Sequence, residues 1–568
     1  MRRPNLARPA FALILALMAQ GALAQDSGAY LAARVAGSDR DHRAAAAWFS
    51  KALISDRQNP ALMEGVIIAN IALGDFEKAA HAARALQATG LKSQSMTLAL
   101  LVESLKADDY AAALGAQQDL HAVGALLERL VTAWAQLGDG RVTEALASFD
   151  AIAGTEGLEA FGLYHKALAL ASAGDMEGAD AILAGKDGQG IALLRRGVIA
   201  HAEILSQLER TEDALAVLDG AFTADDPTVA PLRAKLAAGE ALDYDIARNA
   251  REGIAEVFYT LAAALSGEAE DGYTLVYTRA AAALRPDHTE AIVMSADLLA
   301  AQGQTPLAIE TYAAVPESDP LYVAAVVGRS EAMFAEDRGA DAIEVLKVLA
   351  SDHQDALSVQ LALGDALRRE ERYPEAITAY DKVEALLGTP DRRHWPIFFS
   401  RGMSHEQLDQ WDEAEADLRQ ALALDPEQPH VLNYLGYSLV EQGRNLPEAL
   451  DMIERAVAAR PDSGAIQDSL AWAFFKLGRF DEAVAPMEKA AELEPEDAIL
   501  TDHLGDVYWA VGRKTEARFQ WRRALSFEPD EALETRIKRK LEIGLDGVLS
   551  EEGQGAFATK LAQNAHGN

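Results

Sequence analysis

Histidine is the side chain through which this chain could bind a metal ion or transfer protons. The 568 residues include twelve histidines and no cysteine. The histidines are scattered, without an HExxH pair or a group at metal-ligand spacing, so the sequence predicts no metal site. Because cysteine is absent, a thiol nucleophile, a thiolate-bound metal and a disulfide are all excluded. His430 and His503 fall on predicted helices, where we expect surface or packing roles.

Other catalytic patterns are absent as well. The sequence contains no glycine-rich phosphate loop and no GxSxG nucleophile elbow. Its glycines fall at predicted turns, where helix ends require them. Acidic pairs such as Asp481 and Glu482 stand at predicted helix starts, where the helix dipole favours negative charge. We therefore predict no catalytic residue and no cofactor, and we expect that the chain is not an enzyme.

The formal charge of −36 restricts the partners that the chain can bind. A phosphate backbone requires a basic surface, so the charge argues against a nucleic-acid partner. It argues equally against electrostatic docking on an anionic lipid surface. An acidic surface suits a soluble protein and a basic segment of a partner protein.

The elements that carry these residues repeat along the sequence. Four prolines lie 35, 34 and 34 residues apart: Pro426, Pro461, Pro495 and Pro529. Two series of alanines keep the same interval: Ala414, Ala449, Ala483 and Ala517, then Ala421, Ala456, Ala490 and Ala524. A period of about 34 residues with small residues at fixed offsets indicates a solenoid of helical hairpins.

One repeat, residues 464–497, shows the physical basis of the pattern. Leu470 and Phe474 lie four residues apart and place an apolar stripe along a first helix. Gly478 ends that helix, and a second helix runs until Pro495, which cannot continue it. A single hairpin cannot bury its apolar stripe, so neighbouring hairpins must stack to form the core.

These repeats resemble the tetratricopeptide repeat family. The consensus small and apolar positions are occupied by Leu435, Gly436, Gly443, Ala449, Ala456 and Pro461, and again by Leu504, Gly505, Tyr508, Gly512, Ala517, Ala524 and Pro529. An extra residue within 443–447 departs from the family spacing and explains the single interval of 35. The resemblance implies an all-α fold, a right-handed α-solenoid of helix-turn-helix repeats.

Two repeats also resemble a narrower group of bacterial envelope proteins. Residues 433–450 and 468–484 are similar to a subfamily that includes outer-membrane lipoprotein adaptors, which present substrates to carboxyl-terminal processing proteases. This resemblance implies a non-catalytic scaffold or adaptor whose partner is a periplasmic protease or a cell-wall hydrolase. An assembly factor for pilus or envelope export machinery, and a regulatory subunit of a cell-wall enzyme, are the alternatives.

Residues 1–24 have the pattern of a cleaved secretory signal peptide. Three arginines precede an apolar run at 10–19, and an A-x-A site follows at 22–24. The alternative is an uncleaved anchor, but the run is shorter than the roughly 20 residues that span a bilayer. We therefore expect a periplasmic protein. Because no cysteine follows the run, we expect no lipid anchor, which is a departure from the lipoprotein adaptors.

The glycines and prolines that mark helix ends, and the places where they are missing, divide the remaining chain into four parts. Residues 25–220 read as degenerate repeats, and 254–530 as a well-punctuated array. Residues 221–253 break the rhythm and are either a joint between two halves or an irregular repeat. Residues 531–568 read as a capping helix, which a solenoid needs for solubility, and a frayed tail.

The family resemblance also predicts where a partner binds. First-helix positions that line the concave groove in this family are here Phe399, Met403, His430, Asn433, Tyr437, Asp468, Trp472, Phe475, Asp502, Asp506 and Trp509. We call these eleven positions the groove residues. Two interpretations of Trp472 and Trp509 remain open: they pack between repeats, or they are exposed anchors for a peptide or helix.

Overall fold

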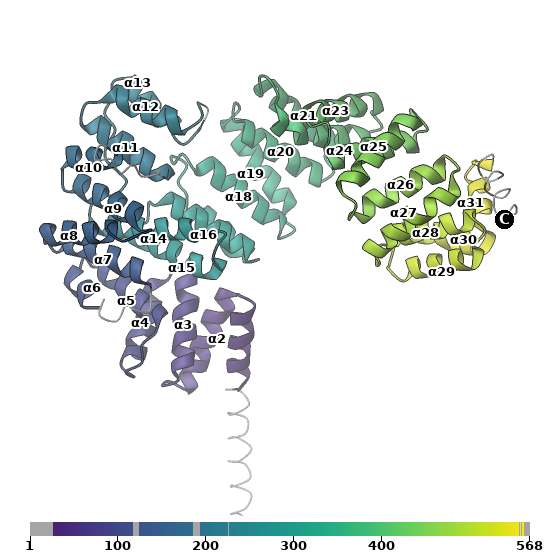
Figure 1. Ribbon diagram of the computed structural model, residues 1–568. Coiled ribbons are helices and arrows are strands. Elements are labelled where there is room, and N and C mark those ends of the chain that lie inside the picture. Colours follow the sequence, from purple (N-terminus) through teal and green to yellow (C-terminus); the bar gives the residue numbers. More distant parts are fainter. Residues whose placement is uncertain are drawn as a thin grey trace, which may run out of the picture. The chain divides into compact units, whose positions relative to one another are not determined.

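The computed structural model describes residues 27–116, 124–185, 194–224 and 226–555, together with 557, 559 and 561. All regular structure in these ranges is helical, and successive helices pack as hairpins (Figure 1). The all-α solenoid fold expected from the sequence is therefore confirmed. The expected signal peptide, residues 1–24, lies outside the described residues.

The chain divides into two compact units, Met1–Leu349 and Ala350–Asn568. Residues 27–38 of the first unit are helical. Its further helices are α2 (His42–Ser55), α3 (Pro60–Ala72), α4 (Phe76–Gln87), α5 (Gln94–Lys106), α6 (Tyr110–Ala116), α7 (Ala125–Gly138), α8 (Val142–Ala153), α9 (Glu159–Ser172), α10 (Met176–Leu183), α11 (Arg195–Gln207), α12 (Thr211–Ala221), α13 (Ala230–Ala237), α14 (Ala250–Leu265), α15 (Asp271–Leu284), α16 (Thr289–Ala301), α17 (Thr305–Tyr312) and α18 (Tyr322–Phe334). Helix α19 (Gly339–Asp352) crosses the division between the units.

The turn between α3 and α4 shows how the first unit forms its hairpins. Gly74 has φ +78°, a left-handed conformation that suits glycine. The side chain of Asp75 then accepts a hydrogen bond from the backbone N–H of Lys78 and caps α4. Ala79 and Ala83 are fully buried, so the two helices approach closely.

Helices α14 and α15 return to earlier hairpins of the first unit. Helix α14 packs against α7 and α9, and α15 packs against α3 and α5. Before them, residues 238–249 form an irregular stretch after α13, within the segment that we expected to be a joint or an irregular repeat. Gly253 on α14 leaves room for the indole of Trp134 on α7, because a Cβ there would lie 2.4 Å from the ring. The core of this unit therefore joins residues that are far apart in sequence.

The second unit is a series of five hairpins followed by two further helices. Its elements are α20 (Leu357–Arg369), α21 (Tyr373–Leu386), the short 3₁₀ helix η2 (Arg392–His394), α22 (Trp395–Glu406), α23 (Trp411–Leu424), α24 (Pro429–Glu441), α25 (Leu446–Ala459), α26 (Gly464–Lys476), α27 (Phe480–Leu493), α28 (Ala498–Ala510), α29 (Lys514–Leu525), α30 (Glu531–Ile543) and α31 (Leu545–Glu551). The extra residue between α24 and α25 is accommodated by Asn445, whose φ of +43° is left-handed.

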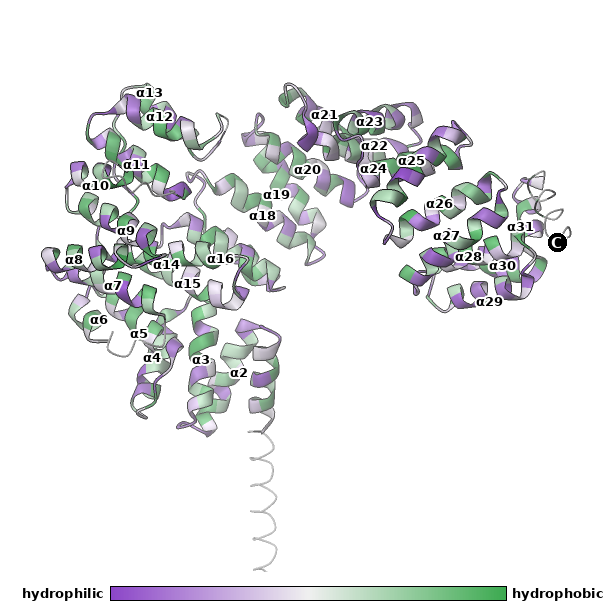
Figure 2. Cartoon of the chain, viewed as in Figure 1, coloured by the Kyte–Doolittle hydropathy of each residue, from purple (hydrophilic) through white to green (hydrophobic). Residues whose placement is uncertain are grey.

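Side-chain polarity follows this stacking. Figure 2 shows hydrophobic and hydrophilic residues mixed along most helices, as expected where a helix buries one side and exposes the other. Within the described ranges, no helix is long and apolar enough to cross a membrane. The same residues contain no group of three His, Cys, Asp or Glu side chains that could hold a metal ion.

Candidate protein-binding surfaces

The groove residues lie on the first helices of four consecutive hairpins, α22, α24, α26 and α28. Helix α26 packs against both α24 and α28, so the last three of these helices are neighbours. Their equivalent positions recur at the repeat interval: Asn433, Asp468 and Asp502 are 35 and 34 residues apart. The sequence register thus places the groove residues on a shared side of the stack, but their surroundings differ along it.

On α22 and α24 the groove residues remain accessible. Phe399, Met403, Asn433 and Tyr437 are half-buried, and His430 is exposed. The Oδ1 atom of Asn433 is buried and has no hydrogen-bond partner among the described residues. An acceptor of this kind gains free energy when a ligand supplies an N–H group. This part of the surface combines aromatic and polar groups without a covering element.

On α26 and α28 the two tryptophans are buried. Trp472 is 8% exposed, and its indole stacks on the ring of His503, with 4.1 Å between the ring centroids, and on Phe475 at 4.8 Å. Trp509 is 5% exposed, and its Nε1 donates a 2.8 Å hydrogen bond to Asp546 at the start of α31. Whether the groove residues bind a partner remains a prediction, but these two indoles are packed within the chain.

The buried carboxylates of α28 are neutralised by α30. The Nζ atom of Lys540, a fully buried side chain, donates hydrogen bonds of 2.6 Å to Asp502 and 2.7 Å to Asp506. The indole Nε1 of Trp521 donates a further 2.9 Å bond to Asp506. Burial and the neighbouring charge of Asp506 raise the pKa of Asp502. Asp502, Asp506 and Lys540 thus form a buried ion cluster.

His503 is a buried imidazole beside this carboxylate cluster. Its Nδ1 lies 2.9 Å from Oδ1 of Asp468. Burial alone would lower the pKa of His503, but the carboxylates of Asp468, Asp502 and Asp506 outweigh burial and raise it above its ordinary value. We expected a surface or packing role for this residue, and the imidazole is packed between an indole and an acidic cluster.

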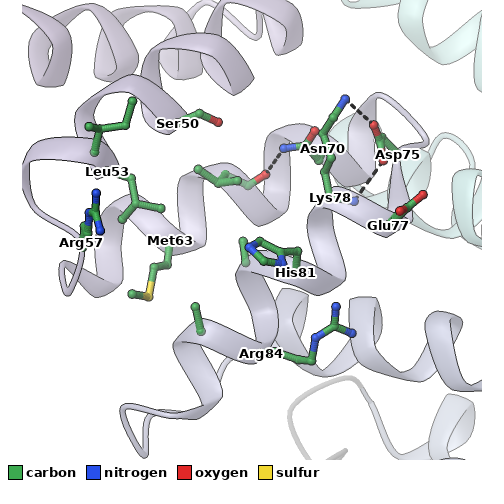
Figure 3. A pocket seen from close by; sticks show the side chains of 14 residues that line it. Ser50, Leu53, Arg57, Met63, Asn70, Asp75, Glu77, Lys78, His81 and Arg84 are labelled. Carbon is green, nitrogen blue, oxygen red and sulfur yellow. Dashed lines mark hydrogen bonds and ion pairs between the residues drawn. The ribbon is translucent and has the colours of Figure 1, made fainter.

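A second candidate surface lies in the first unit, between α2, α3 and α4. The pocket there has a volume of 880 Å³, within the range of ligand sites, and it is open to solvent (Figure 3). Met63, Arg57 and His81 are among the residues that line it. Neither Arg57 nor His81 forms an ion pair or hydrogen bond with a described residue. The charged side chains that line the pocket are of both signs: Arg57, Lys78 and Arg84, with Asp75 and Glu77.

Two of the residues that line the pocket, Ser50 and Asn70, have short side chains. Asn70 stands four residues before the turn glycine Gly74, where the last hairpin has Tyr508 four residues before Gly512. The hydroxyl of Tyr508 reaches across to the preceding second helix and donates a 2.8 Å bond to Glu488. Asn70 instead donates to the carbonyl of Val66 on its own helix. Tyr508 and Glu488 thus bridge the space beside the turn of the last hairpin, whereas the space beside Asn70 stays open.

Comparison with known proteins identifies the repeats. The tetratricopeptide repeat model matches residues 293–356, 335–388, 399–466 and 469–531. Residues 293–388, 399–466 and 469–531 are therefore tetratricopeptide repeats. A TPR repeat-containing protein of Pseudomonas aeruginosa is 28% identical over 184 residues, which are 32% of this chain and 30% of the relative. The match thus spans less than a third of that relative.

Two solved structures are similar to this chain at low sequence identity. The crystal structure of the APC/C hetero-tetramer Cut9-Hcn1 covers 94% of this chain and 99% of its own chain, at 14% identity and a TM-score of 0.38. YrrB, described as a TPR protein with an unusual peptide-binding site, covers 35% of this chain and 99% of its own, at 19% identity and a TM-score of 0.28.

A buried charged cluster fastens the returning helices of the first unit. Arg196 of α11 donates 2.8 and 2.6 Å hydrogen bonds to Glu256 of α14 and Glu290 of α16. Burial would raise the pKa of Glu256, but the charge of Arg196 outweighs it and lowers the pKa to about 2. Tyr164 of α9 also donates to Glu256. These contacts hold the four helices together, so we assign the cluster to the packing of the first unit rather than to a binding site.

Sequence reasoning missed both the cover over α26 and α28 and the pocket of the first unit. The cover had a signal in Lys540, which lies three residues after Ile537 on the buried side of α30. A lysine in such a position requires buried acidic partners, and Asp502 and Asp506 were already groove residues. The pocket had a signal in Asn70, because the last two hairpins carry Phe474 and Tyr508 at this position, whereas Asn70 is short and polar.

Proposed function

We propose that this chain is a non-catalytic scaffold of the bacterial periplasm, which holds a partner protein and presents it to a processing protease. The general role of tetratricopeptide repeats as protein-binding scaffolds supports the first part of the proposal. The signal-like sequence at 1–24 supports export, and the resemblance of residues 433–450 and 468–484 to envelope adaptors supports the protease.

The observation that carries the proposal is the accessible surface on α22 and α24. Tyr437 and Met403 supply half-buried apolar area, and Oδ1 of Asn433 is a buried acceptor that lacks a donor. A partner chain that places a backbone N–H at Asn433 would satisfy this acceptor. The net charge of −36 favours a basic partner segment.

The test is an affinity capture with the chain from Gln25 onward, using a native envelope fraction. We expect recovery of a carboxyl-terminal processing protease or a wall hydrolase with the parent chain. The double variant Asn433→Ala with Tyr437→Ala should lose this recovery, because it removes the free acceptor and an aromatic contact. Gln442→Ala is the matched control, since this exposed residue follows α24 directly.

The outcomes separate the alternatives. Equal recovery with the double variant would move the binding site away from α24. Recovery of pilus or export components would favour an assembly factor, and turnover by the purified chain alone would contradict a non-catalytic scaffold. Fractionation of cells that express the full chain tests the location, since the proposal requires its release with other periplasmic proteins.

A further inference from the structure

The groove residues on α26 and α28 are covered by a segment of the same chain. Helix α31 brings Leu545 and Leu549 into one apolar cluster with Trp472, Phe475 and Trp509. Farther along, the ring of Phe557 packs edge-on against Phe475, with 5.4 Å between the ring centroids, and against Phe480 at 6.0 Å. Leu561 is fully buried in the same cluster. The surface therefore already receives an apolar segment.

The covering segment has the pattern of an amphipathic helix. Gly555, Phe557, Thr559 and Leu561 are helical, and the hydroxyl of Thr559 donates a 2.8 Å bond to the carbonyl of Gly555 four residues earlier. Phe557 and Leu561 are four residues apart and face the cluster, whereas Thr559 is exposed. We call Phe557 and Leu561 the anchor pair.

The attachment of the anchor pair differs from that of α30. Helix α30 is held by the buried ion pairs of Lys540. The described side chains from 555 onward form no hydrogen bond or ion pair with α26, α27 or α28. The connection is an exposed turn, 552–554, in which Gly553 has φ +81°. The contacts that the structure describes for the anchor pair are thus apolar.

We propose that the surface formed by Trp472, Phe475, Phe480 and Trp509 binds an amphipathic helix of a partner protein, and that the anchor pair occupies this place until the partner displaces it. The partner helix carries an aromatic and an aliphatic side chain four residues apart, as the anchor pair does. This inference rests on the proposed function as a protein-binding scaffold and names the chemistry of its ligand.

The physical reason for a gated surface is effective concentration. A segment joined by a short linker competes as if it were present at millimolar concentration, so a free helix of similar affinity binds poorly while the segment is in place. A partner with more apolar contacts, or one delivered at high local concentration, displaces it. The exchange exposes no large apolar surface, because one helix replaces the other.

The first experiment uses a fluorescent peptide with the sequence of residues 551–568 as the probe. We expect it to bind the full-length double variant Phe557→Ala with Leu561→Ala about tenfold or more tighter than it binds the parent chain. Thr559→Ala, an exposed position on the same segment, is the matched control and should behave like the parent. A peptide with alanine at the two anchor positions should not bind. Equal affinity for all three chains, or no binding to the double variant, would overturn the proposal.

A second experiment covers the case in which the double variant unfolds. A specific protease site inserted at Gly553 allows the segment to be cut after the parent chain has folded. We expect the cut fragment to dissociate on dilution while the helical signal and the thermal midpoint of the remaining chain change little. If release of the fragment unfolds the last hairpins, the segment is a structural cap and the proposal is wrong.

The two proposals fail in different ways. If the peptide binds the double variant but envelope capture recovers no protease or hydrolase, the helix-binding surface stands and the adaptor function is wrong. If capture succeeds through Asn433 and Tyr437 while the peptide binds neither chain, the scaffold function stands and the anchor pair is not a displaceable ligand.

Discussion

The early hairpin α3–α4 and the last hairpin, α28–α29, use the same turn but fill the space beside it differently. Both turns place a left-handed glycine, Gly74 or Gly512, between the two helices. Beside the last turn, Tyr508 bridges to Glu488 on the preceding second helix. Beside the first, Asn70 stops short, and a pocket of 880 Å³ remains. Glycine and alanine therefore set the hairpin, and a few larger side chains decide whether the stack is closed or open.

Two sites of buried carboxyl groups, one in each unit, are neutralised in different ways, although Glu256 of the first unit also pairs with a cation, Arg196. Asp502 and Asp506 in the second unit share the ammonium group of Lys540. Glu203 in the first unit accepts a 2.9 Å backbone hydrogen bond from Asp245 and is not ion-paired within the described part of the chain. Burial raises its pKa to about 8. Lys540 neutralises Asp502 and Asp506, whereas Glu203 is neutralised by its own proton.

The largest effect is expected at the neutralised pair. Lys540→Met leaves two buried carboxylates without their cation, so we expect a loss of about 3–5 kcal/mol in the free energy of unfolding. Lys538→Met, an exposed position two residues away on the same helix, should change it by less than about 0.5 kcal/mol. Chemical denaturation followed by tryptophan fluorescence measures both, since Trp509 and Trp521 lie beside the cluster. A loss below about 1 kcal/mol for Lys540→Met would contradict a buried ion cluster.

The next effect concerns the protonated carboxyl of the first unit. The folded-state pKa of Glu203 is about 8, above its unfolded value, so the folded chain binds the proton more tightly and loses stability as the pH rises towards and past 8. Glu203→Gln mimics the neutral form. We expect it to gain about 2 kcal/mol relative to the parent at pH 9 and nothing at pH 4.

The measurement is the pH dependence of the free energy of unfolding for both chains. A parallel pair of pH profiles would show that Glu203 is ionised at no cost in the folded state. The matched exposed control is Glu209→Gln, which should leave the pH dependence unchanged.

A closing substitution tests the origin of the pocket. The double variant Ser50→Glu with Asn70→Tyr transfers the bridging pair of the last hairpins to the first, because Ser50 and Asn70 stand where Glu488 and Tyr508 stand. We expect a gain of about 1 kcal/mol from filling the hollow. Thermal unfolding of the two single variants and the double variant measures the gain and its coupling. Destabilisation of the double variant would show that this space is not equivalent to the one that Tyr508 and Glu488 bridge in the last hairpin.

The smallest effect is the titration of His503. Its folded-state pKa is raised above the unfolded value near 6.5, so its stabilising contribution is complete below that value and is lost as the pH rises through the folded-state pKa. Asp468, Asp502 and Asp506 face the ring. His503→Gln should remove this pH-dependent part of the stability. Urea midpoints measured at pH 5.5 and pH 8.5 test it, and an unchanged difference between the two midpoints would contradict the acidic environment.

The sequence predicted the second unit well because its hairpins carry local helix-end signals, such as a turn glycine or a proline. Gly478 and Pro495 delimit α27, and the interval of 35 anticipated the additional residue that Asn445 accommodates. These signals are local, so they are readable without knowledge of distant contacts. The register also placed the groove residues on the first helices, since equivalent positions of a repeat lie on the same side of the stack.

The remaining features depend on contacts between distant segments. The burial of Trp472 and Trp509 is completed by α31 and the anchor pair, which no repeat pattern connects to them. The return of α14 onto α7 depends on an irregular stretch that has no periodicity. A repeat pattern informs only about neighbouring hairpins. The sequence therefore could not indicate which groove residues remain accessible.

The return of α14 and α15 has a consequence for synthesis. The apolar sides of α3, α5 and α7 are completed by residues 250–284, which leave the ribosome more than a hundred residues after α7. Until then the early hairpins expose surface that a simple solenoid would bury against its next repeat. The second unit can grow one hairpin at a time, whereas the first must wait for its closing helices before it reaches its final stability.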